Sequence, residues 1–336
     1  MKKRRDLLII LSCLFTIFIF ITLVIARGEI IEDKTQKDYK SPSFSDTMDS
    51  NDKIAWVFAG GGSHSVYSAG AEKAIKELKI PDPDIIVGSS GGAPNAFFYI
   101  ANQTKEMETI WCNELSKKEL INPKRFWKIF GRDYMVDEIF NKKYNLNMTA
   151  VKNSKIDVYV GVTDSKTGEV VYFSNKDMGE DGLWDLLKAT LTVPIFSGLV
   201  EKSVSINGRK YIDSKASARA ELNILKAKSL EANKIIVFGE KSSHEERYFG
   251  NFWYECWLYW KTWRTFSTEF MKNQKKAATQ QYSFVDPEGV EILWIGPNGK
   301  PSMPPWSNPQ EGLEGFFKQG YNETMNRGEE LESFFR

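Results

Sequence analysis

Residues 85–93 decide the fold, and they read IIVGSSGGA. An apolar run typical of a strand ends at Gly88, and a helical pattern of apolar residues begins after Gly92. Between them lies a Gly-x-Ser-x-Gly motif, which places Ser90 on a tight turn from a strand to a helix. A serine in such a turn exposes its hydroxyl beside the free N–H groups of a helix N-terminus. The stretch predicts a serine nucleophile, with Gly88, Gly91 and Gly92 as its elbow.

A second glycine cluster precedes this motif at Gly60, Gly61 and Gly62. It follows a strand-like run at 54–59 and precedes a helical pattern at 66–75. Two such strand–glycine–helix units in tandem place both turns at the carboxyl edge of one parallel sheet. Three glycines leave N–H groups exposed to an anion, so we expect an oxyanion hole beside the serine. The alternative is a phosphate-binding loop, although its Gly-Lys-Ser/Thr ending is missing.

Few residues of the chain are candidates for the base that would activate the serine. The chain has two histidines, His64 in the glycine loop and His244 in a charged run typical of a solvated loop. Asp213 ends the turn-and-strand segment 207–212. A carboxylate becomes an effective base when burial raises its pKa. Two arrangements therefore stay open: a dyad of Ser90 with Asp213, and a triad in the chain order Ser90, Asp213, His244.

The order of these motifs resembles that of the patatin-like phospholipases. The resemblance rests on the glycine loop 60–62, the elbow 88–92 and Asp213, with a hairpin-like segment at 160–175 and a helix end at 188–196. It covers about residues 53–240. It implies a three-layer α/β/α fold with a mostly parallel central sheet. It also implies a serine acyl hydrolase that cleaves carboxylic esters of phospholipids, lysophospholipids or related lipids and needs neither a metal nor a cofactor.

Carried onto this chain, the resemblance implies that Ser90 is the nucleophile and Asp213 its base. The N–H groups of Gly60, Gly61 and Gly62 would form the oxyanion hole.

Two departures from the family pattern bear on activity. His64 and Ser65 stand where the family has a basic residue and then glycine, and Ser214 and Lys215 follow the aspartate in place of glycine. A side chain in a tight turn blocks backbone angles that glycine adopts at little cost. A lysine beside the aspartate would lower the pKa of its carboxyl group. The alternative is therefore a catalytically silent, lipid-binding member of the family.

The N-terminus carries a membrane signal. Leu7–Ala26 contains no charged side chain and follows a basic cluster at residues 2–5. About 20 helical residues span a hydrocarbon core of about 30 Å. The basic flank favours a cytoplasmic N-terminus, which predicts a single-pass protein with an extracytoplasmic catalytic domain. A cleaved signal peptide is the alternative because Val24–Ala26 resembles a cleavage site, although the apolar run is longer than usual.

These signals divide the 336 residues into three parts. We expect a membrane anchor at 1–26, a polar flexible linker at 27–52 and one acyl hydrolase domain at 53–336. The domain has its core motifs at 53–240 and an aromatic-rich part at 241–336. A composition with 42% hydrophobic residues suits one large α/β domain of this length.

The aromatic-rich part contains a second candidate for membrane contact. Between Tyr248 and Met271, aromatic residues recur at spacings of three and four. Trp and Tyr favour the bilayer interface, so one interpretation is an interfacial helix or a lid over the acyl site. The alternative is a helix that packs on the sheet. Beyond it we expect a last strand at 290–295 and one closing helix at 311–335.

Charge and cysteine content narrow the remaining function classes. The formal net charge of +1 gives no basic footprint for nucleic acid. Two histidines leave few ligands for a metal site. The cysteines Cys13, Cys112 and Cys256 show no paired spacing. Cys112 and Cys256 either form a disulfide in an oxidising compartment or remain buried free thiols.

Overall fold

The computed structural model describes residues 52–122, 124–125, 128–194, 196, 203–214, 216–239, 241, 266–299 and 308–336. All of them belong to one compact unit, Ser43–Arg336. Within these ranges, no helix combines the length and the apolar character that a bilayer crossing requires. The predicted span Leu7–Ala26 and the linker 27–51 lie outside the described residues.

The strands alternate with helices over the first half of the domain. The strands are β1 (Ile54–Phe58), β2 (Ile85–Ser89), β3 (Asp157–Asp164), β4 (Val170–Ser174), β5 (Val204–Ile206), β6 (Arg209–Ile212), β7 (Lys234–Phe238) and β8 (Glu291–Ile295). The α-helices are α2 (Ser65–Glu77), α3 (Gly92–Ile100), α4 (Thr104–Thr109), α5 (Met148–Asn153), α6 (Glu180–Thr190), α7 (Ala220–Ser229), α9 (Thr268–Tyr282), α10 (Gln310–Met325) and α11 (Gly328–Phe334). The other helical segments are a 3-10 turn η2 (Gly62–His64) and two π-helical segments, η3 (Ile110–Glu114) and η4 (Tyr134–Lys143).

The described strands form one sheet in the order β5-β6-β3-β2-β1-β7-β8, and β4 pairs with β3 outside this path. The five strands from β3 to β8 in that order are parallel to their neighbours. The pairs β3–β4, β3–β6 and β5–β6 are antiparallel. β1 and β7 each have a neighbouring strand on both sides and are buried along their whole length, as expected of strands covered on both faces. The mostly parallel sheet agrees with the sequence prediction.

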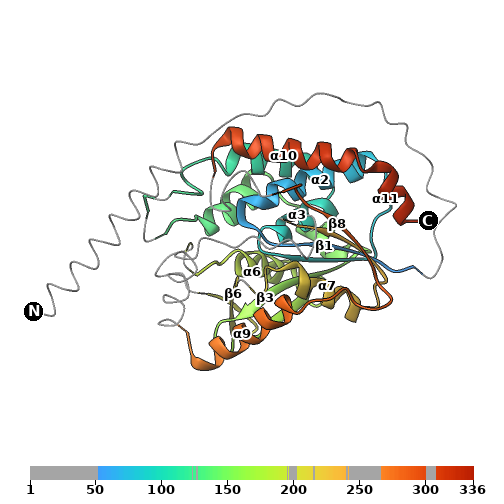
Figure 1. Ribbon diagram of the computed structural model, residues 1–336. Helices are drawn as coiled ribbons and strands as arrows, with labels where there is room; N and C mark the ends of the chain where they lie inside the picture. Colours follow the sequence, from blue (N-terminus) through green and yellow to red (C-terminus); the bar gives the residue numbers. More distant parts are fainter. Residues whose placement is uncertain are drawn as a thin grey trace, which may run out of the picture. The chain divides into compact units, whose positions relative to one another are not determined.

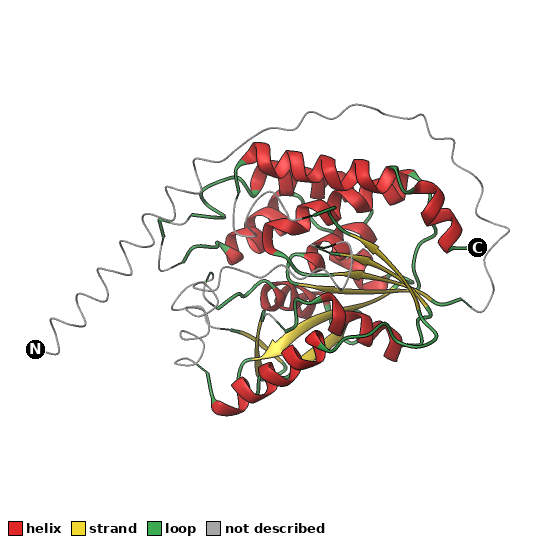
Figure 2. Cartoon of the chain, in the orientation of Figure 1, coloured by secondary structure: helices red, strands yellow, loops and turns green. Residues whose placement is uncertain are grey.

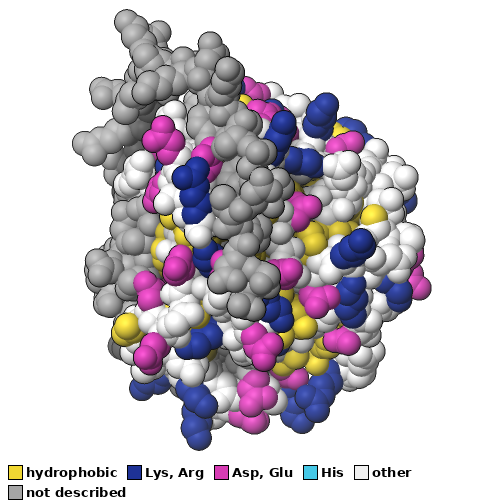
Figure 3. Space-filling model, turned by 90° about the vertical axis from the view of Figure 1, so that its right-hand side faces the viewer, with side chains coloured by type: hydrophobic (Ala, Val, Ile, Leu, Met, Phe, Trp, Pro, Cys, Tyr) yellow, Lys and Arg dark blue, Asp and Glu magenta, His cyan; other side chains and the backbone are white. Residues whose placement is uncertain are grey.

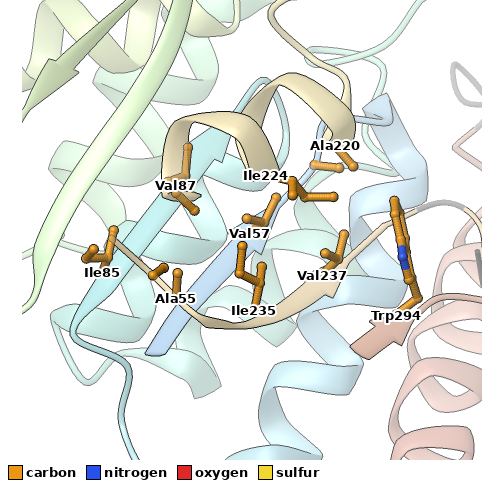
Figure 4. Packing of buried hydrophobic residues seen from close by; sticks show 12 residues of the cluster. Ala55, Val57, Ile85, Val87, Ala220, Ile224, Ile235, Val237 and Trp294 are labelled. Atoms are coloured by element: carbon orange, nitrogen blue, oxygen red, sulfur yellow. The ribbon is translucent and has the colours of Figure 1, made fainter. Parts of the chain in front are cut away.

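Helices cover both faces of this sheet, which gives the three predicted layers (Figures 1 and 2). Helices α2, α3 and α10 lie on one side, and α7 and α9 lie on the other (Figure 1). The core under α7 joins small and branched side chains from strands β1, β2 and β7 with helix residues such as Ile224, and Trp294 closes one end (Figure 4). The opposite face of the sheet holds aromatic rings, with Trp56 against Tyr99 and Phe58 stacked on Phe238.

On the face shown in Figure 3, basic and acidic side chains are interspersed over the described surface. This mixture fits the near-zero net charge of the chain.

The C-terminal part differs from the prediction in two respects. The expected closing helix at 311–335 is two helices, because α10 ends at Met325 and α11 starts at Gly328. Arg327 lies at the break, where its guanidinium donates to the carbonyl of Trp294 at 2.6 Å. The expected aromatic helix Tyr248–Met271 is described only from Phe266, and there α9 begins at Thr268 with Ser267 as its N-cap.

Two glycines let α10 pack closely on α2. A Cβ on Gly70 would overlap the carbonyl oxygen of Phe317, and a Cβ on Gly320 would overlap that of Tyr67. The two helices therefore touch backbone to backbone. This contact holds α2, and with it the glycine loop that precedes α2, against the C-terminal part of the chain.

We expect Gly320→Ala to destabilise the full-length protein by about 1–3 kcal/mol, because the added methyl group overlaps the backbone of Tyr67. Gly315→Ala on the same helix is the matched control, since a Cβ there meets nothing within 4 Å. That variant should gain up to about 1 kcal/mol from helix propensity. Urea unfolding of the detergent-solubilised chain measures both. If the two substitutions change the free energy of unfolding equally, they would contradict the close contact of Gly320 with the backbone of Tyr67.

Candidate active site

Ser90 lies on the turn between β2 and α3, as the motif predicts. β2 ends at Ser89 and α3 begins at Gly92. The backbone of Ser90 has a φ of 49°, in the left-handed region that costs a non-glycine residue about 1–2 kcal/mol. Its side chain is buried, with 6% of the residue exposed. A strained serine at the N-terminus of a helix is the geometry of a nucleophile elbow.

The glycines of the elbow and the loop permit close contact between them. A Cβ on Gly60 would lie 2.6 Å from the Cβ of Ser90. A Cβ on Gly92 would overlap the carbonyl oxygen of Phe58, and one on Gly91 would overlap the hydroxyl of Ser65. The two turns that the sequence predicts at one edge of the sheet therefore lie directly against each other.

The glycine loop presents N–H groups, although not all three that we expected. The N–H of Gly60 donates to the carbonyl of Ala218 at 2.7 Å, so in this structure it is already used. The N–H groups of Gly61 and Gly62 have no acceptor in the part of the chain that the structure describes. Gly62 has a φ of 58°, which explains why glycine is required there. The role of these N–H groups as an oxyanion hole stays a prediction.

Asp213 follows β6, which pairs with β5 through the turn Asn207–Gly208. It is buried, with 3% exposed, and the side chain of Ser90 lies close enough to its carboxyl group to lower the pKa of that group. The hydroxyl of Ser217 donates a hydrogen bond to the carboxylate at 3.4 Å. Burial raises the pKa of Asp213 to about 7, and the nearby side chains of Ser90 and Ser217 limit the rise. The structure therefore brings Ser90 and Asp213 together.

Among the residues that depart from the family pattern, those that the structure describes have an unstrained backbone. Ser65 has an α-helical φ of −63° and starts α2. Ser214 lies outside the left-handed region, and its hydroxyl bonds Thr163 at 2.7 Å and accepts the N–H of Ala216 at 3.1 Å. Its hydroxyl therefore shapes the turn for which the family uses glycine. Lys215 lies outside the described residues.

The structure describes one of the two histidines, His64. His64 is buried in η2 and packs its ring against Phe316 of α10, 5.7 Å away. His244 lies outside the described residues, so the triad with this histidine stays a prediction. Of the cysteines, Cys112 is a buried free thiol, and Cys13 and Cys256 are not described.

Sequence reasoning missed several polar residues around the elbow. Thr190, at the end of α6, accepts the N–H of Ser90 at 2.7 Å. Asn223 of α7 donates to the hydroxyl of Ser89 at 2.8 Å. These side chains come from distant segments and carry no motif. One sequence signal was available: threonines recur in the apolar run that follows Lys188.

A small cavity adjoins the glycine loop. It has a volume of about 10 Å³ and is lined by Gly60, Ala218 and Trp294, among others. Glu221 and Lys241 form a buried ion pair of 2.6 Å in its wall. A space of this size holds about one water molecule, so it is too small for an acyl chain.

Residues 56–217 match the family described as patatin-like phospholipase. This segment is a patatin-like phospholipase domain. It contains the glycine loop, the elbow, Asp213 and Ser217, and it ends before α7.

A known protein is similar to part of the chain. The uncharacterized protein YjjU of Escherichia coli (strain K12) is 24% identical over 167 residues, which cover 48% of this chain and 45% of that protein. The match thus spans less than half the length of this relative.

Two solved structures show partial likeness at 11% identity. VipD from Legionella pneumophila has a TM-score of 0.45, with 92% of this chain and 73% of that chain covered. The ExoU–SpcU complex from the type III secretion system of Pseudomonas aeruginosa has a TM-score of 0.35, with 92% and 60% covered. The family assignment rests on the sequence match and not on these structures.

The raised pKa of Asp213 predicts a pH-dependent stability. Between pH 4 and pH 7 the folded patatin domain holds a proton that the unfolded chain releases, so the free energy of unfolding falls as pH rises. The cost at pH 8 is at most about 4 kcal/mol, from about three pKa units. Relative to the wild type, the free energy of unfolding of Asp213→Asn should therefore be higher at pH 8 than at pH 4.5. Chemical unfolding at both pH values measures this gain. A difference that stays constant would show that the carboxyl group titrates normally.

Proposed function

We propose that this protein is a serine acyl hydrolase that cleaves carboxylic esters of phospholipids, lysophospholipids or related lipids. The observation that carries the proposal is the position of the strained Ser90 beside the carboxyl group of the buried Asp213. Membership of residues 56–217 in the patatin-like phospholipase family supports a lipid ester as the substrate class.

In the proposed first step, the Ser90 hydroxyl oxygen attacks the ester carbonyl carbon while its proton passes to the Asp213 carboxylate. The carbonyl oxygen becomes an oxyanion that accepts hydrogen bonds from the N–H groups of Gly61 and Gly62. When the tetrahedral intermediate collapses, the ester C–O bond breaks and the proton on Asp213 goes to the leaving alcohol. The products are the acyl-serine and the free alcohol.

In the second step, water attacks the acyl-serine carbonyl and gives a proton to Asp213. Collapse of the second intermediate breaks the bond to Ser90 Oγ, which takes the proton back as the carboxylic acid leaves. Burial supports this use of an aspartate, since a pKa of about 7 suits a base at neutral pH far better than the ordinary value near 4.

We expect the purified full-length protein to release fatty acid from phospholipid or lysophospholipid micelles and to react with a fluorophosphonate probe at Ser90. Ser90→Ala should abolish both activities. Asp213→Asn should slow hydrolysis by about 10²–10⁴-fold, because it removes the base while keeping the side-chain shape. Titration of released acid and mass spectrometry of the labelled peptide are the measurements.

His244→Ala is the matched control for the dyad and should stay near the wild-type rate. Loss of activity in that variant, with survival of Asp213→Asn, would establish the triad alternative instead. If the wild type neither cleaves esters nor reacts with the probe, yet binds lipid vesicles as well as Ser90→Ala does, the protein is a silent lipid-binding member of the family.

We further propose that Leu7–Ala26 anchors the domain on the extracytoplasmic side of a membrane, supported by its apolar length and its basic flank. In bacterial cells, the full-length chain should resist carbonate extraction, and protease added to spheroplasts should digest the domain. A mature chain that begins after Ala26 would favour the signal peptide. Protection from the protease would contradict the proposed orientation.

A further inference from the structure

The amide of the proposed nucleophile is bound by a side chain from another helix. The N–H of Ser90 donates to the hydroxyl of Thr190 at 2.7 Å, and this hydroxyl donates onward to the carbonyl of Gly161 in β3 at 3.1 Å. Thr190 is fully buried, so no water replaces it. A buried amide without an acceptor costs about 1–3 kcal/mol. The threonine hydroxyl therefore stabilises the left-handed backbone of Ser90.

The same short segment also binds the aspartate. Two residues after Thr190, the carbonyl of Thr192 accepts the N–H of Asp213 at 2.9 Å. One three-residue segment at the end of α6 thus holds the backbone N–H of both proposed dyad members. The segment therefore links the backbone positions of Ser90 and Asp213.

A buried arginine fixes the segment from its other side. The guanidinium of Arg132 donates to the hydroxyl of Thr192 at 2.6 Å and pairs with Asp133 at 2.5 Å. The Thr192 hydroxyl in turn donates to the carbonyl of Lys188 at 2.6 Å. With both ends bonded, the segment has little freedom to rotate.

We infer that Thr190 is a positioning residue of the proposed hydrolase, whose hydroxyl holds the Ser90 backbone in the orientation that aims its side chain at Asp213. This inference rests on the proposed function. It assigns to the N–H of Ser90 a structural role, which leaves the anion-binding role to the loop donors Gly61 and Gly62. Only a side chain that both accepts and donates a hydrogen bond serves at this position, so serine should replace threonine and valine should not.

The test compares Thr190→Val with Thr190→Ser in the full-length protein. Valine has the shape of threonine without its hydroxyl, so we expect the rate constant for fluorophosphonate labelling of Ser90 to fall roughly ten- to hundredfold. Serine should keep it within about threefold of the wild type, because the hydroxyl remains. The pKa seen in the pH dependence of labelling should rise in the valine variant, since a misplaced Ser90 no longer stabilises the Asp213 carboxylate.

Tyr172→Phe is the matched control. It removes another side-chain hydrogen bond, the one that Tyr172 donates to Asn223 at 2.9 Å, without touching the N–H of Ser90. It should lower the unfolding midpoint much as Thr190→Val does, yet label within about threefold of the wild type. If Tyr172→Phe slows labelling as much as Thr190→Val, or if Thr190→Val labels like the wild type, the inference is wrong.

Amide hydrogen exchange at Ser90 separates this inference from the proposed function, because it does not require catalysis. We expect the amide to be protected in the wild type and in Thr190→Ser, and to exchange faster in Thr190→Val. A wild type that is folded but unlabelled overturns the proposed function, and unchanged exchange in Thr190→Val overturns the inference. Should Thr190→Val fail to fold, Thr190→Cys keeps the volume with a weaker donor and serves in the same comparison.

Discussion

The separation between Ser90 and Asp213 is fixed by the backbone pairing of β3. Gly161 of β3 is the register partner of Ser89, and Thr163, two residues further, is the partner of Ile212. Ser89 directly precedes Ser90, and Ile212 directly precedes Asp213. Because the two pairings are parallel and antiparallel respectively, β2 and β6 reach the same end of β3 from opposite directions, and their next residues meet there. A slip of either strand by one residue would turn its side chains to the other face.

The glycines of the site follow from this arrangement. Pairing of β1 with β2 brings Phe58 opposite Gly88, so the two turns that follow these strands must pass each other closely. Gly60 and Gly92 lie where any side chain would overlap the neighbouring turn. Glycine is thus needed at these positions for close approach, whereas at Gly62 it is needed for a left-handed backbone. The glycine loop lies beside the serine because the two turns follow strands that pair with each other.

Much of this organisation was predictable from the sequence, because it is local. Apolar runs that end in glycine mark β1 and β2, and the Asn207–Gly208 turn marks the hairpin that presents Asp213. The contacts that sequence reasoning missed all join distant segments. The N–H of Gly60 is bound by Ala218, and the N–H of Ser90 by Thr190, and nothing near either residue in the chain indicates its partner. The break between α10 and α11 was missed because the apolar pattern continues across it.

The site combines two unfavourable features, a left-handed serine and a buried carboxylate, and the structure reduces the cost of each with hydrogen bonds. The strain at Ser90 is offset by the acceptor that Thr190 supplies, and the charge on Asp213 is stabilised by the Ser217 hydroxyl and by Ser90 beside it. Burial of Asp213 lowers stability, and in the proposed hydrolase it also favours proton transfer from the serine, because it raises the carboxyl pKa to about 7. The proposed dyad therefore needs no histidine as its base. The use of serine at 214, where the family has glycine, fits this scheme: its hydroxyl bonds Thr163 of β3 and so holds the residue after Asp213 to the strand that aligns the site.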